Sequence, residues 1–142
     1  MNPEALDVYL LCAAALTFNL GLLVFLTGAG RTKTKVFTIP EDAETFKGEC
    51  KEKEAPSVQR AIAAHRNALE NIPMFLILGF LHVATGATKT SALAYFVTFT
   101  VARWFHTLAY LRSMQPWRTL SFSVGFLAMM GVAARLMITA LT

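Results

Sequence analysis

The chain has only two cysteines among its 142 residues, Cys12 and Cys50. Cys12 lies within an apolar segment and Cys50 within a polar one, so we do not expect the two to reach disulfide distance. No cysteines and histidines recur at the spacing of a zinc site. The chemistry of this protein is therefore expected to use neither a disulfide framework nor a bound metal.

Charge is also scarce. Asp, Glu, Lys and Arg make up 15% of the chain, hydrophobic residues make up 55%, and the mean hydropathy is +0.49. Soluble domains carry about 25% charged residues. The net charge of +4 comes largely from basic residues beside apolar segments, where membrane topology accounts for them, so no nucleic-acid partner is expected. The composition indicates an integral membrane protein.

The first long apolar segment has no charged residue from Val8 to Gly30, a run of 23 residues. About 20 residues suffice to cross a bilayer as a helix. Glu4 and Asp7 precede the run, whereas a signal peptide begins with Lys or Arg, so a retained membrane helix is favoured over a cleaved leader. Gly28 and Gly30 are expected to end this helix.

Three further apolar segments follow, which predicts an all-α, four-transmembrane-helix bundle in one domain, residues 1–142. The expected helices span about 6–29, 57–85, 91–112 and 116–141, and a polar loop spans 30–56. This loop exceeds the length at which structureless loops become uncommon, about 12–15 residues, so part of it is expected to fold back over a site.

Basic residues are distributed unevenly among the loops. The loops after the first and third helices are rich in them, whereas the loop after the second has Lys89 alone. The positive-inside rule then places both termini on the non-cytoplasmic side. The basic residues beside the apolar segments in these two loops include Arg31, Lys33, Lys35, Arg112 and Arg118.

The second helix begins with a polar cluster and is apolar after Asn71. Arg66 and Glu70 are i,i+4 neighbours, and Asn67 and Glu70 are i,i+3 neighbours, so the three lie on adjoining parts of one helical surface. One interpretation is a solvated helix start with an ion pair. The other is a functional cluster, because ionisable groups near membrane depth are costly and usually have partners in a protein interior.

The third helix carries Arg103, His106 and Tyr110 at i, i+3 and i+7, which places them on one stripe. Their side chains can point into a shared cavity. They can also form a buried hydrogen-bond network that only holds the bundle together, with Arg103 paired to Glu70.

The fourth helix begins with Arg118 and two hydroxyl residues, Thr119 and Ser121. The free amides of a helix N-terminus favour anions. A thiolate would be stabilised at this position.

Several of these motifs, in this order, resemble the MAPEG superfamily, the membrane-associated proteins of eicosanoid and glutathione metabolism. The resemblance covers about residues 30–136 and is greatest to the branch of glutathione transferases and prostaglandin E synthases. It implies a homotrimer of four-helix subunits, with glutathione bound between neighbouring subunits near the cytoplasmic side. The residues and motifs that carry it are Arg60, Ile39-Pro40-Glu41-Asp42, His65-Arg66-Asn67 with Glu70, Ala102 to Leu111, and Arg118 to Phe122.

The resemblance also implies site residues. Glutathione has two carboxylates and one ammonium group, so its site needs several guanidinium groups and at least one carboxylate. The positions that match family glutathione-binding residues are Arg31, Arg66, Asn67, Glu70, Arg103, His106 and Tyr110. The positions that match catalytic residues are Arg118, Thr119 and Asp42. Arg118 is expected to lower the pKa of the glutathione thiol, and Thr119 to donate a hydrogen bond to the thiolate.

The implied function is a glutathione transferase or peroxidase that directs the thiolate at a lipophilic electrophile or lipid hydroperoxide from the bilayer. Phe122 favours this over a prostaglandin-endoperoxide isomerase, since prostaglandin E synthases tend to have tyrosine there. A non-catalytic lipid-binding helper of the same fold is a third alternative, which the presence of Arg118 disfavours. The expected location is the inner membrane of a bacterium or the endoplasmic reticulum of a eukaryote, with the active site towards the cytoplasm.

Overall fold

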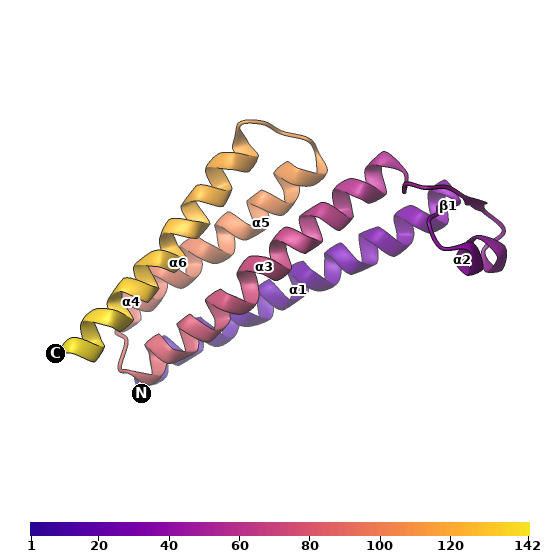
Figure 1. Ribbon diagram of the computed structural model, residues 1–142. Coiled ribbons are helices and arrows are strands. Elements are labelled where there is room, and N and C mark those ends of the chain that lie inside the picture. The colour runs from indigo at the N-terminus through magenta and orange to yellow at the C-terminus, as the bar shows by residue number, and fades with distance from the viewer.

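Long helices make up most of the computed structural model, which describes residues 1–142 (Figure 1). α1 packs mainly against α3, and α5 against α6. The helical elements in chain order are α1 (Pro3–Thr34), α2 (Pro40–Thr45), α3 (Pro56–Ala84), α4 (Lys89–Ala92), the π-helical segment η1 (Leu93–Val97), α5 (Thr98–Leu111) and α6 (Trp117–Leu141). Two short strands, β1 (Val36–Phe37) and β2 (Glu49–Cys50), lie between α1 and α3.

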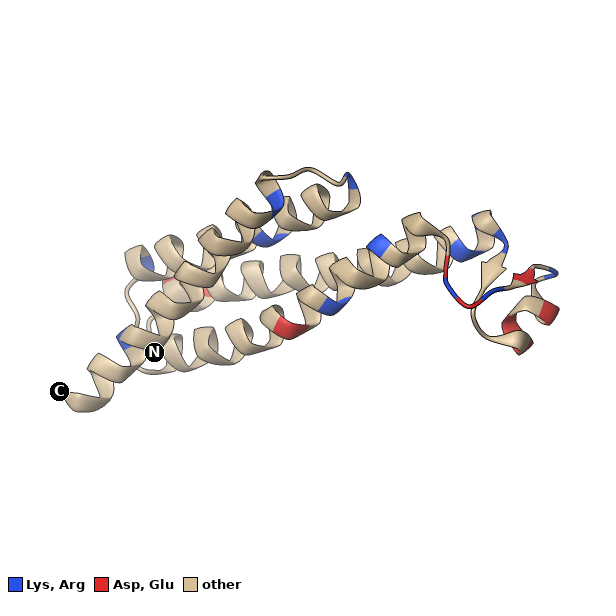
Figure 2. Ribbon diagram, turned by 45° about the horizontal axis from the view of Figure 1, so that its top comes forward, with Lys and Arg blue, Asp and Glu red and all other residues tan.

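Three of the helices, α1, α3 and α6, are long and apolar enough to cross a membrane. The third apolar segment forms α4, η1 and α5, which follow one another without a break over residues 89–111. α5 alone has 14 residues, so a fourth membrane span stays a prediction. Figure 2 shows long uncharged stretches along these helices, with most of the acidic residues gathered around α2 and the short strands. The all-helical fold class is confirmed.

The predicted end of the first helix at residue 29 is wrong, because α1 continues to Thr34. It stops at Lys35, whose φ of 54° leaves the right-handed helical region. Gly30 serves close packing instead of termination, since a Cβ at this position would lie 2.9 Å from Cγ2 of Val58 on α3. α1 also begins at Pro3, three residues before the predicted start, and the remaining predicted helix bounds lie within two residues of the observed ones.

The segment between α1 and α3 is more ordered than the predicted polar loop at 30–56. β1 and β2 pair in parallel, with Val36 opposite Glu49 and Phe37 opposite Cys50. The Phe37 ring stacks on Phe46, with 5.6 Å between the ring centroids. We call residues 35–55 the excursion. Within one chain the excursion folds on itself at the C-terminal end of α1, away from the α5–α6 turn (Figures 1 and 2). The predicted folding of this segment over a site is therefore not seen within one chain.

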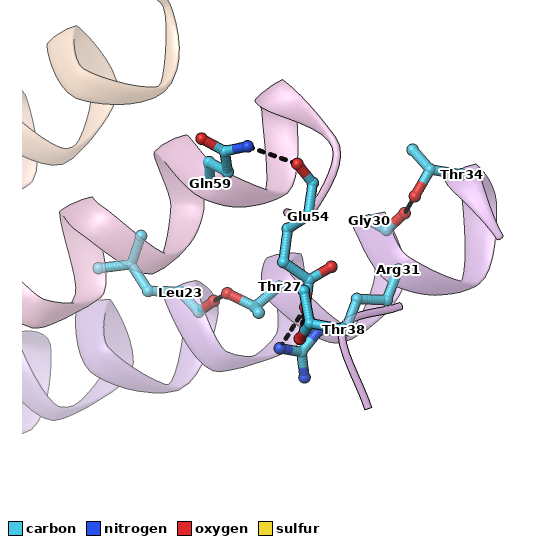
Figure 3. A network of polar contacts seen from close by, with 8 residues as sticks. All are labelled: Leu23, Thr27, Gly30, Arg31, Thr34, Thr38, Glu54 and Gln59. Atoms are coloured by element: carbon cyan, nitrogen blue, oxygen red, sulfur yellow. Dashed lines mark hydrogen bonds and ion pairs between the residues drawn. The ribbon is translucent and has the colours of Figure 1, made fainter. Parts of the chain in front are cut away.

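An ion pair fastens the excursion to α1 (Figure 3). The Arg31 guanidinium contacts Oε1 of Glu54 through Nη2 at 2.6 Å and donates to it through Nε at 2.8 Å. Thr38 donates to the same oxygen at 3.4 Å, and the Gln59 amide donates to the Glu54 carbonyl. Glu54 is only 7% exposed, so its charge depends on this partner.

The core between the helices combines aromatic rings with alanines. Phe75 of α3 stacks on Phe99 of α5 with 3.6 Å between ring centroids, and Phe96 meets Phe75 edge-on. Small side chains such as Ala68 and Ala109 are fully covered and let the helices approach closely. Many large apolar side chains instead face outward, which is expected of surfaces that lie against lipid or another subunit. The most exposed ones on the long helices include Leu11, Phe18, Phe25, Leu127 and Met137.

Candidate active site

A cleft of about 260 Å³ lies where α3, α5 and α6 meet, beside the α5–α6 turn. It brings together five residues that the sequence predicts for the site, from three different helices. Its lining consists of Asn67 from α3, His106 and Tyr110 from α5, and Arg118, Thr119 and Phe122 from α6. Of the three residues on the predicted stripe of the third helix, His106 and Tyr110 line this cavity and Arg103 does not. We call this feature the cleft.

Arg118 is held in the cleft by two neighbours. Its Cζ lies 4.7 Å from the centroid of the Tyr110 ring, within the range of a cation–π contact. With its amide oriented to match the surrounding donors and acceptors, Gln115 accepts from Nη2 of Arg118 at 2.7 Å and from Nε at 3.2 Å. A guanidinium restrained in this way presents a positive charge at a defined place. Gln115 was not among the residues predicted from the sequence, where its spacing of three residues from Arg118 is the only signal for this contact.

Thr119 stands beside Arg118 in the first turn of α6. In the same orientation of Gln115, the amide nitrogen donates to Oγ1 of Thr119 at 3.2 Å. The Thr119 hydroxyl therefore keeps its own proton for donation to a ligand. No side chain caps the start of α6. The Arg118 amide donates to the Met114 carbonyl, whereas the amides of Trp117 and Thr119 have no backbone partner and can face an anion.

His106 joins α5 to the first turn of α6. Its side chain is 3% exposed, and Nδ1 lies 2.9 Å from the carbonyl oxygen of Arg118. Since a carbonyl only accepts, Nδ1 is the donor, and Nε2 of the neutral ring is left as an acceptor. Nε2 is buried and has no partner in the chain. His106 therefore positions the backbone of Arg118 and offers one acceptor to a ligand.

Arg103 lies behind the cleft and is not part of its lining. It is 1% exposed, and its Nη2 donates to Oδ1 of Asn67 at 2.6 Å. The alternative in which Arg103 pairs with Glu70 is wrong. Arg103 instead orients the Asn67 amide and adds a buried positive charge next to the cleft. That charge has no carboxylate partner within the chain.

Arg66 and Glu70 form the predicted i,i+4 ion pair, with 3.3 Å between Nε and Oε1. Both side chains are well exposed, at 83% and 58% respectively. They lie on the face of α3 next to Asn67 and do not line the cleft. An exposed pair of this kind contributes little to stability, roughly 0–1 kcal/mol.

Arg31 and Asp42 are the two predicted site residues that lie farthest from the cleft. Arg31 is on the last turn of α1, where Glu54 occupies its guanidinium. Asp42 is in α2, within the excursion. Because α2 and the end of α1 lie apart from the α5–α6 turn (Figure 1), one chain does not bring these residues to the cleft.

An apolar groove of about 460 Å³ runs between α5 and α6. Its walls include Val101 and Phe105 of α5 and Trp117 and Leu120 of α6. Ser121 also lines the groove, and its hydroxyl lies 3.0 Å from the carbonyl oxygen of Arg118. The groove and the cleft are therefore next to each other across the first turns of α6.

Comparison with known proteins identifies the family of the chain. The model of the MAPEG family matches residues 9–138. Prostaglandin E synthase of Bos taurus is 34% identical over 137 residues, which cover 96% of this chain and 90% of the relative. Prostaglandin E synthase of Homo sapiens is 33% identical over 138 residues, 96% of this chain and 91% of the relative. Microsomal glutathione S-transferase 1 of Homo sapiens is 37% identical over 142 aligned positions, 96% of this chain and 92% of the relative. By the family model and by these relatives, the chain belongs to the MAPEG family.

Proposed function

We propose that the protein is a membrane-embedded glutathione transferase that activates the glutathione thiol in the cleft and uses lipid hydroperoxides as a second class of substrate. The observation that carries the proposal is the placement of the Arg118 guanidinium and the Thr119 hydroxyl at the open start of α6. An opposite charge within about 4–6 Å favours the ionised thiol, and the thiolate is the nucleophile. The electrophile takes the sulfur, and its leaving group departs with the bonding electrons.

The rest of the cleft suits the polar body of glutathione. Asn67 offers an amide, His106 an acceptor at Nε2, and Tyr110 a phenol. The buried charge of Arg103 favours a carboxylate nearby. These groups supply binding, whereas Arg118 and Thr119 supply the activation.

We further propose a homotrimer of four-span subunits in which glutathione lies between neighbouring subunits. Arg66 and Glu70 are exposed next to the cleft, and Arg31 and Asp42 are far from it. A site shared between subunits is the arrangement in which all of these residues contact one ligand. The large apolar side chains on the outside of α1 and α6 would then lie against lipid or a neighbouring subunit.

The groove between α5 and α6 is the proposed route for the lipophilic electrophile. Its walls are apolar, and it adjoins the first turn of α6, where the thiolate would lie. A substrate dissolved in the bilayer can enter such a groove sideways without passing through water.

Prostaglandin-endoperoxide isomerisation is the second candidate, since several relatives are prostaglandin E synthases. Phe122 in the cleft has no hydroxyl, which favours the transferase. The test is turnover of a chloronitroaromatic halide, a lipid hydroperoxide and a prostaglandin endoperoxide by the detergent-purified protein with glutathione. Turnover of the first two supports the proposal, and turnover of the endoperoxide alone makes the protein an isomerase. Without turnover of any of them, the non-catalytic lipid-binding helper replaces both.

Arg66→Ala is expected to raise the Michaelis constant for glutathione by about tenfold and to leave the turnover number nearly unchanged. The proposed partner of Arg66 is a glutathione carboxylate, which is present before and after the reaction, so its contact stabilises ground state and transition state alike. Steady-state kinetics with varied glutathione measures both constants. Arg60→Ala is the matched control, because Arg60 is exposed on the same helix and does not line the cleft. A loss of turnover without a change in the Michaelis constant would refute this role.

The topology is also testable. Single cysteines placed at Lys51 and at Thr142, in a chain without Cys12 and Cys50, are expected to react with an impermeant thiol reagent from opposite sides of the membrane. Labelling in sealed vesicles before and after permeabilisation gives the sidedness. Equal labelling of both positions from one side would contradict four spans.

A further inference from the structure

A second polar cavity lies at the opposite end of the bundle from the cleft. It has a volume of about 60 Å³ and sits between the end of α3, the turn before α4, and the end of α6. Most of its lining is polar, in contrast to the apolar surfaces around it. The polar side chains that line it include those of His82, Thr85, Thr88, Ser91, Arg135 and Thr139. We call it the far-end cavity.

Arg135 has no counter-ion within the chain. The four ion pairs of the structure do not include it. Glu4, at the same end of the bundle, is engaged by Lys89 at 3.0 Å. The residues that share the cavity with Arg135 bring hydroxyl groups and an imidazole but no carboxylate. The far-end cavity therefore combines an unpaired positive charge with hydrogen-bonding groups, which suits an anion.

The side chains around Arg135 are held in place. Nε2 of His82 lies 2.7 Å from Oγ of Ser91, which ties the end of α3 to α4. Oγ1 of Thr88 accepts from the Ser91 amide at 3.2 Å, so the Thr88 hydroxyl still has its own proton to donate. The Thr139 hydroxyl donates to the Arg135 carbonyl at 3.0 Å. One free hydroxyl and one guanidinium thus face a cavity with fixed walls.

The size of the cavity limits the ligand. Roughly 10–15 Å³ of such space holds one water molecule, so a cavity of about 60 Å³ admits a group of a few non-hydrogen atoms. A phosphate group meets this limit, whereas a whole lipid headgroup, an amino acid or a nucleotide does not. The remainder of the ligand must lie outside.

The depth of the cavity in the membrane indicates that this phosphate belongs to a lipid. Arg118 and Arg135 lie on the same helix, about 25 Å apart along its axis at 1.5 Å per residue. The hydrocarbon core of a bilayer is about 30 Å thick. With the cleft near one membrane surface, the backbone of Arg135 lies near the opposite edge of the hydrocarbon core, and its long side chain can extend to the lipid phosphates there.

We propose that the far-end cavity binds the phosphate group of a membrane lipid, in the leaflet opposite the cleft. Arg135 provides the charge, through a bidentate contact with two phosphate oxygens, and Thr88 donates a hydrogen bond. The acyl chains lie along the apolar outer surface of α6. The lipid so bound holds the turn between α3 and α4 against the end of α6.

The test measures lipid retention by the full-length, delipidated protein in detergent, using native mass spectrometry. The probes are phosphatidylglycerol, diacylglycerol with the same chains, and inorganic phosphate as a competitor. Wild type is expected to retain phosphatidylglycerol about tenfold more tightly than Arg135→Gln does, and Thr88→Val about threefold less tightly than wild type. Lys89→Gln is the matched control, because Lys89 is a cation at the same end that does not line the cavity, and it should behave as wild type.

The outcomes of this experiment distinguish a lipid phosphate from a free phosphate ion. Retention of phosphatidylglycerol over diacylglycerol, with loss in Arg135→Gln and partial displacement by millimolar phosphate, supports the proposal. Equal retention of the two lipids, or retention by Arg135→Gln within twofold of wild type, overturns it. Binding of inorganic phosphate without retention of phosphatidylglycerol would make the ligand a free oxyanion and overturn the lipid assignment. If Arg135→Gln does not fold, Arg135→Lys and Thr88→Val decide the question by the same criteria.

Discussion

Arg118→Ala is expected to lower the turnover number by about ten- to a hundredfold while glutathione affinity changes by only a modest factor. Loss of a charge-assisted hydrogen bond costs roughly 1.5–3 kcal/mol, which corresponds to this range in rate. The effect falls on turnover because the charge of Arg118 acts most strongly on the sulfur that reacts, and not on the carboxylates that bind. Steady-state kinetics and calorimetric titration with glutathione separate the two quantities.

The matched control is Arg112→Ala. Arg112 stands in the same α5–α6 turn, is exposed and does not line the cleft, so this change should leave both quantities near wild type. Arg118→Lys keeps the charge but loses the planar guanidinium group that contacts Gln115 and Tyr110. A turnover number between those of wild type and Arg118→Ala is therefore expected. If Arg118→Ala loses affinity alone and keeps its turnover, the catalytic role proposed for Arg118 is wrong.

Arg31→Ala is expected to destabilise the excursion by about 2–3 kcal/mol, below the 3–5 kcal/mol of a fully buried ion pair because Arg31 is one-third exposed. The cost arises because the change leaves the carboxylate of Glu54 buried without its partner. Limited digestion with trypsin measures it, since Lys47 and Lys51 are exposed within the excursion. Cleavage should be faster by about one to two orders of magnitude where local opening limits the rate.

Two further variants give this prediction its controls. Lys33→Ala removes an exposed cation from the same last turn of α1 and should leave the cleavage rate unchanged. The double variant Arg31→Ala with Glu54→Gln removes the unpaired charge and should recover part of the lost protection. If Arg31→Ala is cleaved no faster than Lys33→Ala, the ion pair between Arg31 and Glu54 does not stabilise the excursion, and this prediction is wrong.

Helix positions were largely predictable, because a long apolar run can cross a membrane only as a helix. The end of α1 was not. Gly28 and Gly30 look like a helix terminus in the sequence, but α1 passes through both, and the close approach of Val58 accounts for Gly30. A glycine that permits contact between helices and one that ends a helix cannot be told apart without knowing what packs against it.

The site was predictable where it depended on one helix. The spacing of His106 and Tyr110 places both on the cleft face of α5, as expected. Contacts between different helices were harder to predict from the sequence. Arg103 bonds to Asn67 and not to Glu70, since the facing surface of α3 is set by the packing of the whole bundle. The partner of Arg31, Glu54, is 23 residues away along the chain and is brought close only by the fold of the excursion.

The most direct test of the central claim is the ionisation of bound glutathione. Detergent-purified protein is titrated with glutathione by calorimetry, and the thiolate absorbance difference is followed from acid to alkaline pH, for wild type and Arg118→Ala. A free thiol ionises near pH 8.5. We expect binding at or below millimolar glutathione. The thiolate signal of bound glutathione should appear at lower pH than that of free glutathione, and in Arg118→Ala it should shift back towards the pH of free glutathione. Absence of binding at millimolar glutathione, or binding with an unshifted thiol in the wild type, would contradict the central claim.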